Sequence, residues 1–100
     1  MFVMITYDVE AKRTVKFRKL LRRFLGHEQF SVFFGDITPS KLEQMHRDLN
    51  RLIVDGDRLI EISAPNRLNV DIAMWTKEGR ANGLPDISSD TRHKSDVQII

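Results

Sequence analysis

The sequence predicts an α+β sandwich in which two helices cover one face of a small, mainly antiparallel sheet. Three observations predict it: an uncharged β-rich segment opens the chain, two amphipathic helical patterns follow, and further β segments alternate with them. The order strand, helix, strand, helix, strand is close to the ferredoxin-like plan. A chain of 100 residues is long enough for one two-layer domain and too short for two.

The first predicted unit is a strand over residues 2–7 followed by a helix over residues 12–25. The strand segment is rich in β-branched and aromatic residues, which suits a central strand buried on both faces. The helix is indicated by apolar residues that recur at helical spacing and would face the sheet. These residues are Phe17, Leu20, Leu21 and Phe24. Gly26 is a typical helix end.

The second predicted unit comprises a β segment over residues 29–34, a helix and a strand over residues 58–64. We expect the three phenylalanines of the β segment to fill the core or a subunit interface, with base stacking by one of them as the rarer alternative. Gly35 is expected to bend or split this segment. The helix is expected to begin with Thr38 as its N-cap and Pro39 at its first position, with Ser40 and Glu43 as a competing capping box. Its apolar stripe consists of Leu42, Met45, Leu49, Leu52 and Ile53.

The last part of the chain is expected to lie outside this core. Residues 68–76 alternate strictly between two faces and predict an extra C-terminal strand. Because the strand is surplus to a small sheet, we expect it to pair with a sheet edge, its own or that of another protomer. No period survives in residues 77–100, which predict an extended C-terminal tail whose apolar end, residues 97–100, is able to add a strand to a surface.

A row of cations lies opposite the apolar face of the first helix. It consists of Lys12, Lys16, Lys19 and Arg23, with Arg13 and Arg22 beside it. Cations repeating once per helical turn can meet successive phosphates of a duplex backbone, a form of binding that does not depend on base sequence. The competing interpretation is a solvated helix face. Between Asp8 and Gln29 the chain carries seven basic residues and two acidic ones, more positive charge than solubility requires.

Asp8 ends the first predicted strand. A single carboxylate at such a position can hold Mg²⁺, which often takes one or two protein carboxylates and completes its shell with water and phosphate oxygens. It can equally cap a turn or a helix, and this second role is the commoner one. His46 lies beside the apolar stripe of the second helix without a second ligand at metal spacing, so we expect a surface or edge residue.

Composition excludes several classes of protein. The chain has no cysteine, so a disulfide framework, a thiolate nucleophile and a cysteine-ligated metal are all excluded, which is consistent with a reducing cytosol. No segment approaches the length of a membrane span, and no secretory signal is recognisable before the first strand. We therefore expect a cytoplasmic protein without a membrane partner. The formal net charge of +2 is modest, so its basic character is local.

Four features together resemble a known family. They are Tyr7–Asp8 at the end of the first strand, the basic helix, the segment SVFFGDIT from Ser31 to Thr38, and the second amphipathic helix. In this order and spacing, over residues 1 to about 64, they are similar to the small CRISPR-associated endonuclease family, CRISPR-associated protein two.

The resemblance implies a ferredoxin-like homodimer with Asp8 of each subunit as the metal ligand and catalytic residue near the dimer axis. Members are described as metal-dependent nucleases on RNA or DNA, and also as non-catalytic bridges that hold two CRISPR integrase dimers along a double-stranded DNA prespacer. A strand beyond the core commonly joins the sister subunit's sheet, which would suit residues 68–76. Tails can dock on the integrase, which would suit residues 77–100.

The chain departs from the family pattern at Phe34, where an acidic residue is common, and at His27, where a basic residue is common. We therefore expect first a DNA-binding structural subunit of spacer acquisition, with the basic helix on phosphates. The second hypothesis is a Mg²⁺-dependent endonuclease that uses Asp8, for which His27 is a weak candidate base. The third is a ferredoxin-like regulatory or toxin-like module unrelated to CRISPR.

Overall fold

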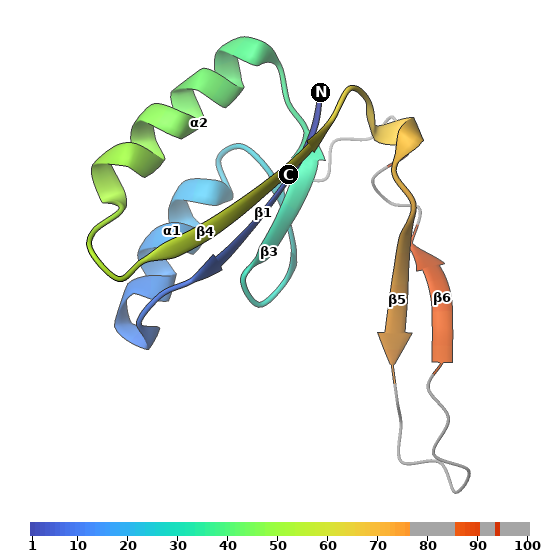
Figure 1. The fold of residues 1–100 in the computed structure, drawn as a ribbon, viewed down its shortest axis with the longest axis horizontal. Coiled ribbons are helices and arrows are strands. Elements are labelled where there is room, and N and C mark those ends of the chain that lie inside the picture. The colour runs from blue at the N-terminus through green and yellow to red at the C-terminus, as the bar shows by residue number, and fades with distance from the viewer. Residues whose placement is uncertain (77–85, 91–93, 95–100) are drawn as a thin grey trace, which may run out of the picture.

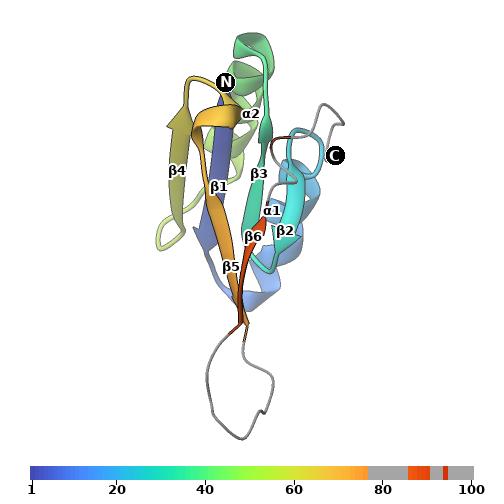
Figure 2. The same cartoon turned by 90° about the vertical axis from the view of Figure 1, so that its right-hand side faces the viewer.

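The computed structural model describes residues 1–76, 86–90 and 94 and has the predicted α+β architecture (Figure 1). An antiparallel sheet of four strands has the order β2-β3-β1-β4, as in a ferredoxin-like sandwich. Both helices cover one face of this sheet, and a separate two-stranded sheet lies on the other side (Figures 1 and 2). The elements of the four-stranded sheet and its helices are β1 (Phe2–Asp8), α1 (Thr14–Leu21), β2 (Gly26–Gln29), β3 (Val32–Asp36), α2 (Pro39–Leu52) and β4 (Arg58–Ala64).

The central strand β1 pairs with β3 on one side and β4 on the other, as the uncharged segment predicts. Its alternate residues Val3, Ile5 and Tyr7 belong to one buried cluster with Phe17 of α1 and Met45 of α2. Because these side chains lie between the sheet and the two helices, removal of their apolar surface from water is the main force joining the two layers.

The first helix is shorter than the prediction of residues 12–25. A short 3-10 helix, η1 (Ala11–Arg13), precedes α1, and α1 ends at Leu21. The chain then tightens, since the backbone N–H of Phe24 donates to the carbonyl of Leu21 at 3.0 Å. Three-residue bonds of this kind close helix ends, so the apolar pattern continues into a turn rather than into a further helical turn.

The predicted β segment over residues 29–34 is wrong in its bounds. The chain instead forms a hairpin of β2 and β3, with a turn at residues 30–31 between them. Gly35 neither bends nor splits the segment: it lies within β3 and faces Val3 of β1. The strand β2 went unpredicted because its residues, Gly26–Gln29, lack the β-branched pattern that marks a strand.

Helix α2 and strand β4 agree with the prediction. Thr38 accepts a hydrogen bond from the backbone N–H of Lys41 at 3.3 Å, and Pro39 follows as the first helical residue. His46 is exposed at the edge of the helix and bonds to Glu61 of β4 at 2.6 Å, which agrees with a surface residue. None of the helices in the described residues is long and apolar enough to cross a membrane.

The strand predicted over residues 68–76 is shorter than expected. A 3-10 helix, η2 (Arg67–Asn69), precedes β5 (Ile72–Thr76). Strand β5 pairs with β6 (Asp86–Asp90), so part of the predicted extended tail forms a strand of its own. The exchange with a sister subunit stays a prediction. Residues 77–85, 91–93 and 95–100, including the predicted terminal strand at 97–100, lie outside the described residues.

The face of the sheet opposite the helices is only partly covered. Strand β5 lies over part of this face, since Ile72 and Met74 line one hollow together with Met4 of β1 and Phe34 of β3 (Figure 2). Ile60 and Ile62 of β4 remain 49% and 53% exposed. An apolar area of this kind on a strand is typical of an interface.

Arg13 connects the start of the first helix to the turn before β4. Its guanidinium donates to Asp57 Oδ2 at 2.8 Å and to the carbonyl of Leu52 at 2.8 Å. The Asp57 side chain is 4% exposed. The hydrogen bond from Arg13 is the main cause that lowers the pKa of the Asp57 carboxyl, against an opposing effect of desolvation. The Asp57 carboxyl therefore stabilises the fold through its contact with Arg13 only while this carboxyl is ionised.

We expect Asp57→Asn to lower the melting temperature at neutral pH. Because the folded pKa is lowered, the contribution of Asp57 is present above its unfolded pKa of about 3.9 and is lost as the pH falls through the folded pKa. Thermal unfolding of both proteins from neutral to acidic pH should therefore show a difference that shrinks toward low pH. Asp55→Asn, at an exposed neighbouring position, is the control. A difference that is constant with pH would contradict the assignment.

Candidate nucleic-acid interface

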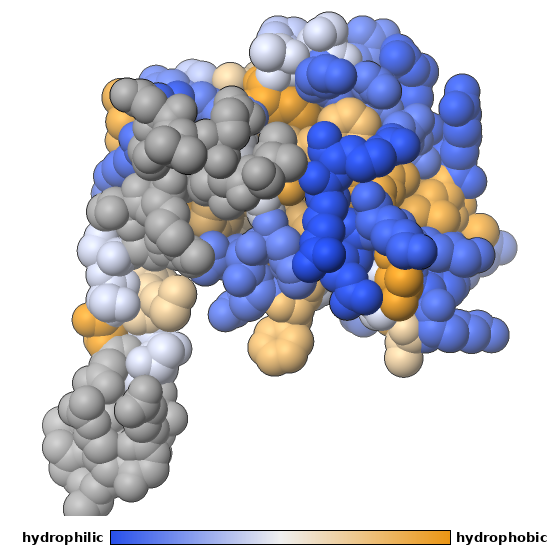
Figure 3. Space-filling model, turned by 180° about the vertical axis from the view of Figure 1, so that it is seen from behind, coloured by the Kyte–Doolittle hydropathy of each residue, from blue (hydrophilic) through white to orange (hydrophobic). Residues whose placement is uncertain are grey.

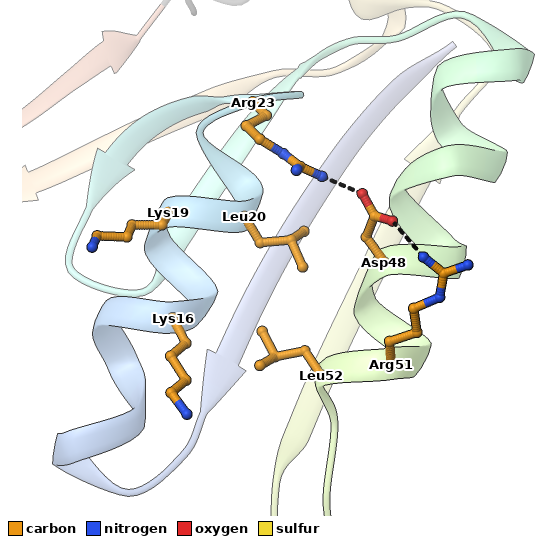
Figure 4. A pocket seen from close by; sticks show the side chains of 7 residues that line it. All are labelled: Lys16, Lys19, Leu20, Arg23, Asp48, Arg51 and Leu52. Carbon is orange, nitrogen blue, oxygen red and sulfur yellow. Dashed lines mark hydrogen bonds and ion pairs between the residues drawn. The ribbon is translucent and has the colours of Figure 1, made fainter.

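A groove between α1 and α2 is lined by cationic side chains from both helices (Figure 4). Its volume is about 470 Å³. Its lining residues, which define the interhelical groove, are Lys16, Lys19, Leu20, Arg23, Asp48, Arg51 and Leu52. Leu20 and Leu52 point toward each other between the helices, Arg23 and Asp48 meet beside them, and Lys19 points away from α2 (Figure 4). The groove thus combines an apolar floor with a charged rim.

Asp48 is the one carboxylate in this lining. Arg23, in the turn that follows α1, donates a hydrogen bond to it across the groove, and Arg51 lies one helical turn away with its guanidinium 3.9 Å from the carboxylate (Figure 4). The Asp48 side chain is 22% exposed. The groove therefore holds four cations against one partly shielded carboxylate, which leaves a net charge of +3.

The two lysines of the groove are one helical turn apart on α1. In the described part of the chain, Lys16 and Lys19 have no acidic side chain within ion-pair distance, and both are exposed. An ammonium group without a carboxylate partner keeps its full attraction for an external anion. These lysines are therefore the most available cations in the groove.

The other predicted cations of the basic row lie outside the groove. Lys12 lies in η1 and pairs with exposed Glu10 at 3.5 Å. Arg13 is held by Asp57 inside the protein and is not available to a ligand. Arg22 turns toward β2, where its Nη2 lies 3.4 Å from His27 Nδ1. Of the six cations predicted from the sequence, three line the groove, namely Lys16, Lys19 and Arg23, and the other three lie outside it.

The side of the molecule that carries α1 and β2 is mainly hydrophilic (Figure 3). Hydrophobic areas appear between the polar side chains without joining into one broad surface (Figure 3). A surface of this kind suits contact with a charged polymer better than burial against an apolar protein face.

Asp8 is exposed at the end of β1, opposite Arg58 of β4 in the strand register. It borders two hollows. One, on the open face of the sheet, is also lined by Thr6, Arg58 and Ile60. The other lies at the strand end and has a volume of about 360 Å³. We name this second one the strand-end hollow; it is lined by Tyr7, Asp8, Val9, Thr14, Arg18, Phe30 and Ser31.

Tyr7 supports the strand-end hollow from inside the core. Its ring stacks on Phe17 at 5.5 Å and on Phe33 at 6.2 Å between ring centroids. Burial raises the pKa of the Tyr7 phenol, and the nearby charges of Arg18 and Arg22 reduce that rise. The raised pKa keeps the phenol neutral at physiological pH.

The residues near Asp8 provide a limited set of metal ligands. Within residues 1–76, 86–90 and 94, no group of three or more His, Cys, Asp or Glu side chains is close enough to hold a metal ion. Asp8 can supply one carboxylate to Mg²⁺, with the remaining positions open to water and phosphate oxygens. Arg58 and Arg18 on either side make the site more attractive to phosphate than to an isolated cation.

The two departures from the family pattern have structural roles. Phe34 is 1% exposed and packs on Phe2 with ring centroids 5.9 Å apart. His27 stacks on Phe33 at 4.5 Å, and its Nε2 bonds to the carbonyl of Phe30 at 2.7 Å. The ring of His27 is therefore held in the hairpin, where it fixes the turn between β2 and β3.

Sequence reasoning missed two cations that the fold adds to these sites. Arg51 of α2 joins the interhelical groove, and Arg18 of α1 joins the strand-end hollow. A signal for Arg51 exists in its spacing of three residues from Asp48, but its use depends on which helix faces lie side by side. Sequence periodicity alone does not contain that information.

Comparisons with known proteins agree with this architecture. The family model described as CRISPR associated protein Cas2 matches residues 1–69. A "CRISPR-associated endoribonuclease Cas2" of Haloferax volcanii is 41% identical over 66 residues, which is 66% of this chain and 77% of that protein. A protein of the same description from Thermotoga maritima is 40% identical over 53 residues, 53% of this chain and 61% of that protein.

A solved structure described as "Crystal structure of cas2" is similar to this one with a TM-score of 0.68 and 30% sequence identity. The match covers 72% of this chain and 82% of that chain. The shared region is the α+β sandwich that carries Asp8 and the interhelical groove. The chain therefore belongs to the CRISPR associated protein Cas2 family.

Proposed function

We propose that this chain is a nucleic-acid-binding subunit of CRISPR spacer acquisition, and that its interhelical groove holds the phosphate backbone of duplex DNA. The observation that carries this proposal is the convergence on one groove of four cations from α1, the turn that follows it, and α2. Family membership supports the CRISPR context and argues against an unrelated regulatory or toxin-like module.

The groove suits a backbone rather than a base sequence. Lys16 and Lys19 lie on the same face of the helix, where residues three apart have Cβ atoms roughly 5–6 Å from each other. Their ammonium groups can therefore meet neighbouring phosphates of one backbone. Arg23 and Arg51 supply planar guanidinium groups, which bind phosphate oxygens in pairs. These contacts position a duplex without reading its bases.

The proposal includes a homodimer. Ile60 and Ile62 present apolar side chains on the uncovered part of the sheet, and a second copy of this chain packed on that face would remove them from water. Such a dimer would carry two interhelical grooves and would bridge two CRISPR integrase dimers along a double-stranded prespacer. The integrase partnership rests on the family resemblance, and most of the tail proposed to dock there lies outside the described residues.

A second function is favoured by Asp8 and by the relatives' descriptions. Those relatives are described as endoribonucleases, and Asp8 is exposed beside a hollow that also contains Arg18. Arg18 would orient a phosphodiester, and Asp8 would hold Mg²⁺. The ion would neutralise charge on the scissile phosphate and lower the pKa of a bound water. We rank this function second because Asp8 is the only carboxylate among the described residues that line the hollow.

We expect the double variant Lys16→Glu/Lys19→Glu to weaken binding of a blunt DNA duplex by roughly tenfold or more and to reduce the salt slope by about 2. The reason is that each lysine releases counterions from one phosphate. Asp48→Asn should act in the opposite direction, because it removes the one carboxylate of the groove. Fluorescence anisotropy at several salt concentrations measures both effects.

The control for net charge is Lys41→Glu/Arg47→Glu, which reverses two exposed charges of α2 outside the groove lining. This variant should keep most of the duplex affinity. An equal loss in the two double variants would show that binding follows total charge and would remove the groove from the proposal.

The Asp8 hypothesis has its own test. We expect the purified chain to leave duplex DNA intact in Mg²⁺ and in EDTA, and we expect any Mg²⁺-stimulated cleavage of single-stranded RNA to fall to background in Asp8→Asn. Denaturing gels of end-labelled substrates measure both. Asp55→Asn, an exposed carboxylate in the turn before β4, is the matched control. Cleavage that survives in Asp8→Asn would exclude Asp8 as the catalytic ligand.

The homodimer is tested by Ile60→Glu/Ile62→Glu. Placing charges in an apolar interface should weaken self-association by on the order of a hundredfold or more, because each charge would be buried without a partner. Sedimentation velocity over a range of concentrations measures the change. Val54→Glu, at a position that is 50% exposed in the loop between α2 and β4, should leave association unchanged. If Ile60→Glu/Ile62→Glu dimerises as strongly as the wild type and the Val54→Glu control, the interface lies elsewhere.

A further inference from the structure

We propose that the turn between β2 and β3 carries a second nucleic-acid subsite, in which the ring of Phe30 stacks on an unpaired base while Arg18 holds the adjacent phosphate. This inference rests on the proposed function to the extent that the ligand is a nucleic acid. It differs in ligand, since the interhelical groove takes the paired backbone and the Phe30 subsite takes a single strand.

The exposure of Phe30 is not explained by the fold. Its neighbours Phe33 and Phe34 are 0% and 1% exposed, whereas Phe30 is 88% exposed. The core therefore gains almost nothing from this ring, and a polar residue would serve a solvent-exposed turn better. An aromatic ring presented in this way offers both a flat apolar surface and a rigid attachment, the two properties that a base-stacking platform needs.

The backbone at this position also favours another residue type. Phe30 has a φ of 39°, in the left-handed region where glycine and asparagine are favoured. The turn is nevertheless well held, because His27 bonds to the carbonyl of Phe30 at 2.7 Å and stacks on Phe33. A side chain that is unfavourable for the turn and unused by the core points to a role in binding.

The surroundings of Phe30 identify the ligand. The strand-end hollow has a volume of about 360 Å³, inside the range of roughly 300–1,000 Å³ that is typical of small-ligand pockets. Arg18 supplies a cation for a phosphate, and Ser31 supplies a hydroxyl group. Asp8, which also lines the hollow, can accept hydrogen bonds from the amino groups of a base that stacks on Phe30, and it repels phosphate.

The ligand must be unpaired. Bases inside a duplex have both faces covered by their neighbours, whereas a single-stranded end exposes a face that is free to stack. An apolar protein partner fits this surface less well, because Phe30 lies among the charged side chains of Arg18 and Asp8 rather than in a broad hydrophobic patch.

The test compares two DNA probes with the full chain. Both have the same duplex and the same short single-stranded overhang, but one overhang lacks bases. We expect the wild-type protein to bind the overhang with bases more tightly, by on the order of tenfold, and we expect Phe30→Gly to lose this preference. Phe30→Tyr should keep it. Binding of a blunt duplex should be the same in all three proteins.

Stability separates a binding role from a structural one. Glycine accepts the left-handed φ, so Phe30→Gly should melt at or above the wild-type temperature. If it melts lower, Phe30→Asn repeats the comparison with a residue that also accepts this conformation. A preference for bases that survives in both variants overturns the proposal, and so does the absence of any preference in the wild type.

The two proposals can fail separately. If the wild-type protein prefers the overhang with bases but its blunt-duplex binding does not depend on Lys16 and Lys19, the groove is overturned and the Phe30 subsite remains. Blunt-duplex binding without any dependence on Phe30 would overturn the subsite and leave the groove.

Discussion

The packing of α1 and α2 on the apolar side of β1 is the interaction on which the rest of the structure depends. Val3, Ile5 and Tyr7 present one buried row to both helices. Because both helices must cover this row, they lie side by side. Arg23, in the turn after α1, and Arg51 of α2 therefore reach the same groove. The end of the same strand places Asp8 at the surface. One buried strand therefore positions both candidate sites.

Electrostatics divides the cations of the first helical segment into different roles. Arg13 is held by Asp57 and stabilises the connection between layers, whereas Lys16 and Lys19 remain available to an external anion. Arg23 is intermediate between a structural and an available cation, since it lines the groove but is paired with Asp48 there. A helix with many positive charges is therefore not uniformly a binding surface. The distribution of carboxylates across the neighbouring helix and turn decides which charges can reach a ligand.

Elements with strong local signals could be predicted from the sequence, and those that depend on tertiary contacts could not. The Thr38–Pro39 start of α2 and the uncharged β1 segment are local signals, and both elements were predicted. Strand β2 lacks such a signal and depends on pairing with β3, where His27 stacks on Phe33. The groove could be predicted only in part. Lys16, Lys19 and Arg23 share a helical period in the sequence, whereas Arg51 joins them through helix packing.

The most direct test of the central claim is an NMR titration of the full chain with a short blunt DNA duplex, which follows the arginine Nε–H and lysine side-chain signals. We predict saturable changes at Lys16, Lys19, Arg23 and Arg51, together with little change at Arg13, whose guanidinium is held by Asp57. Saturable binding that changes other signals and leaves these four unaffected would contradict the account.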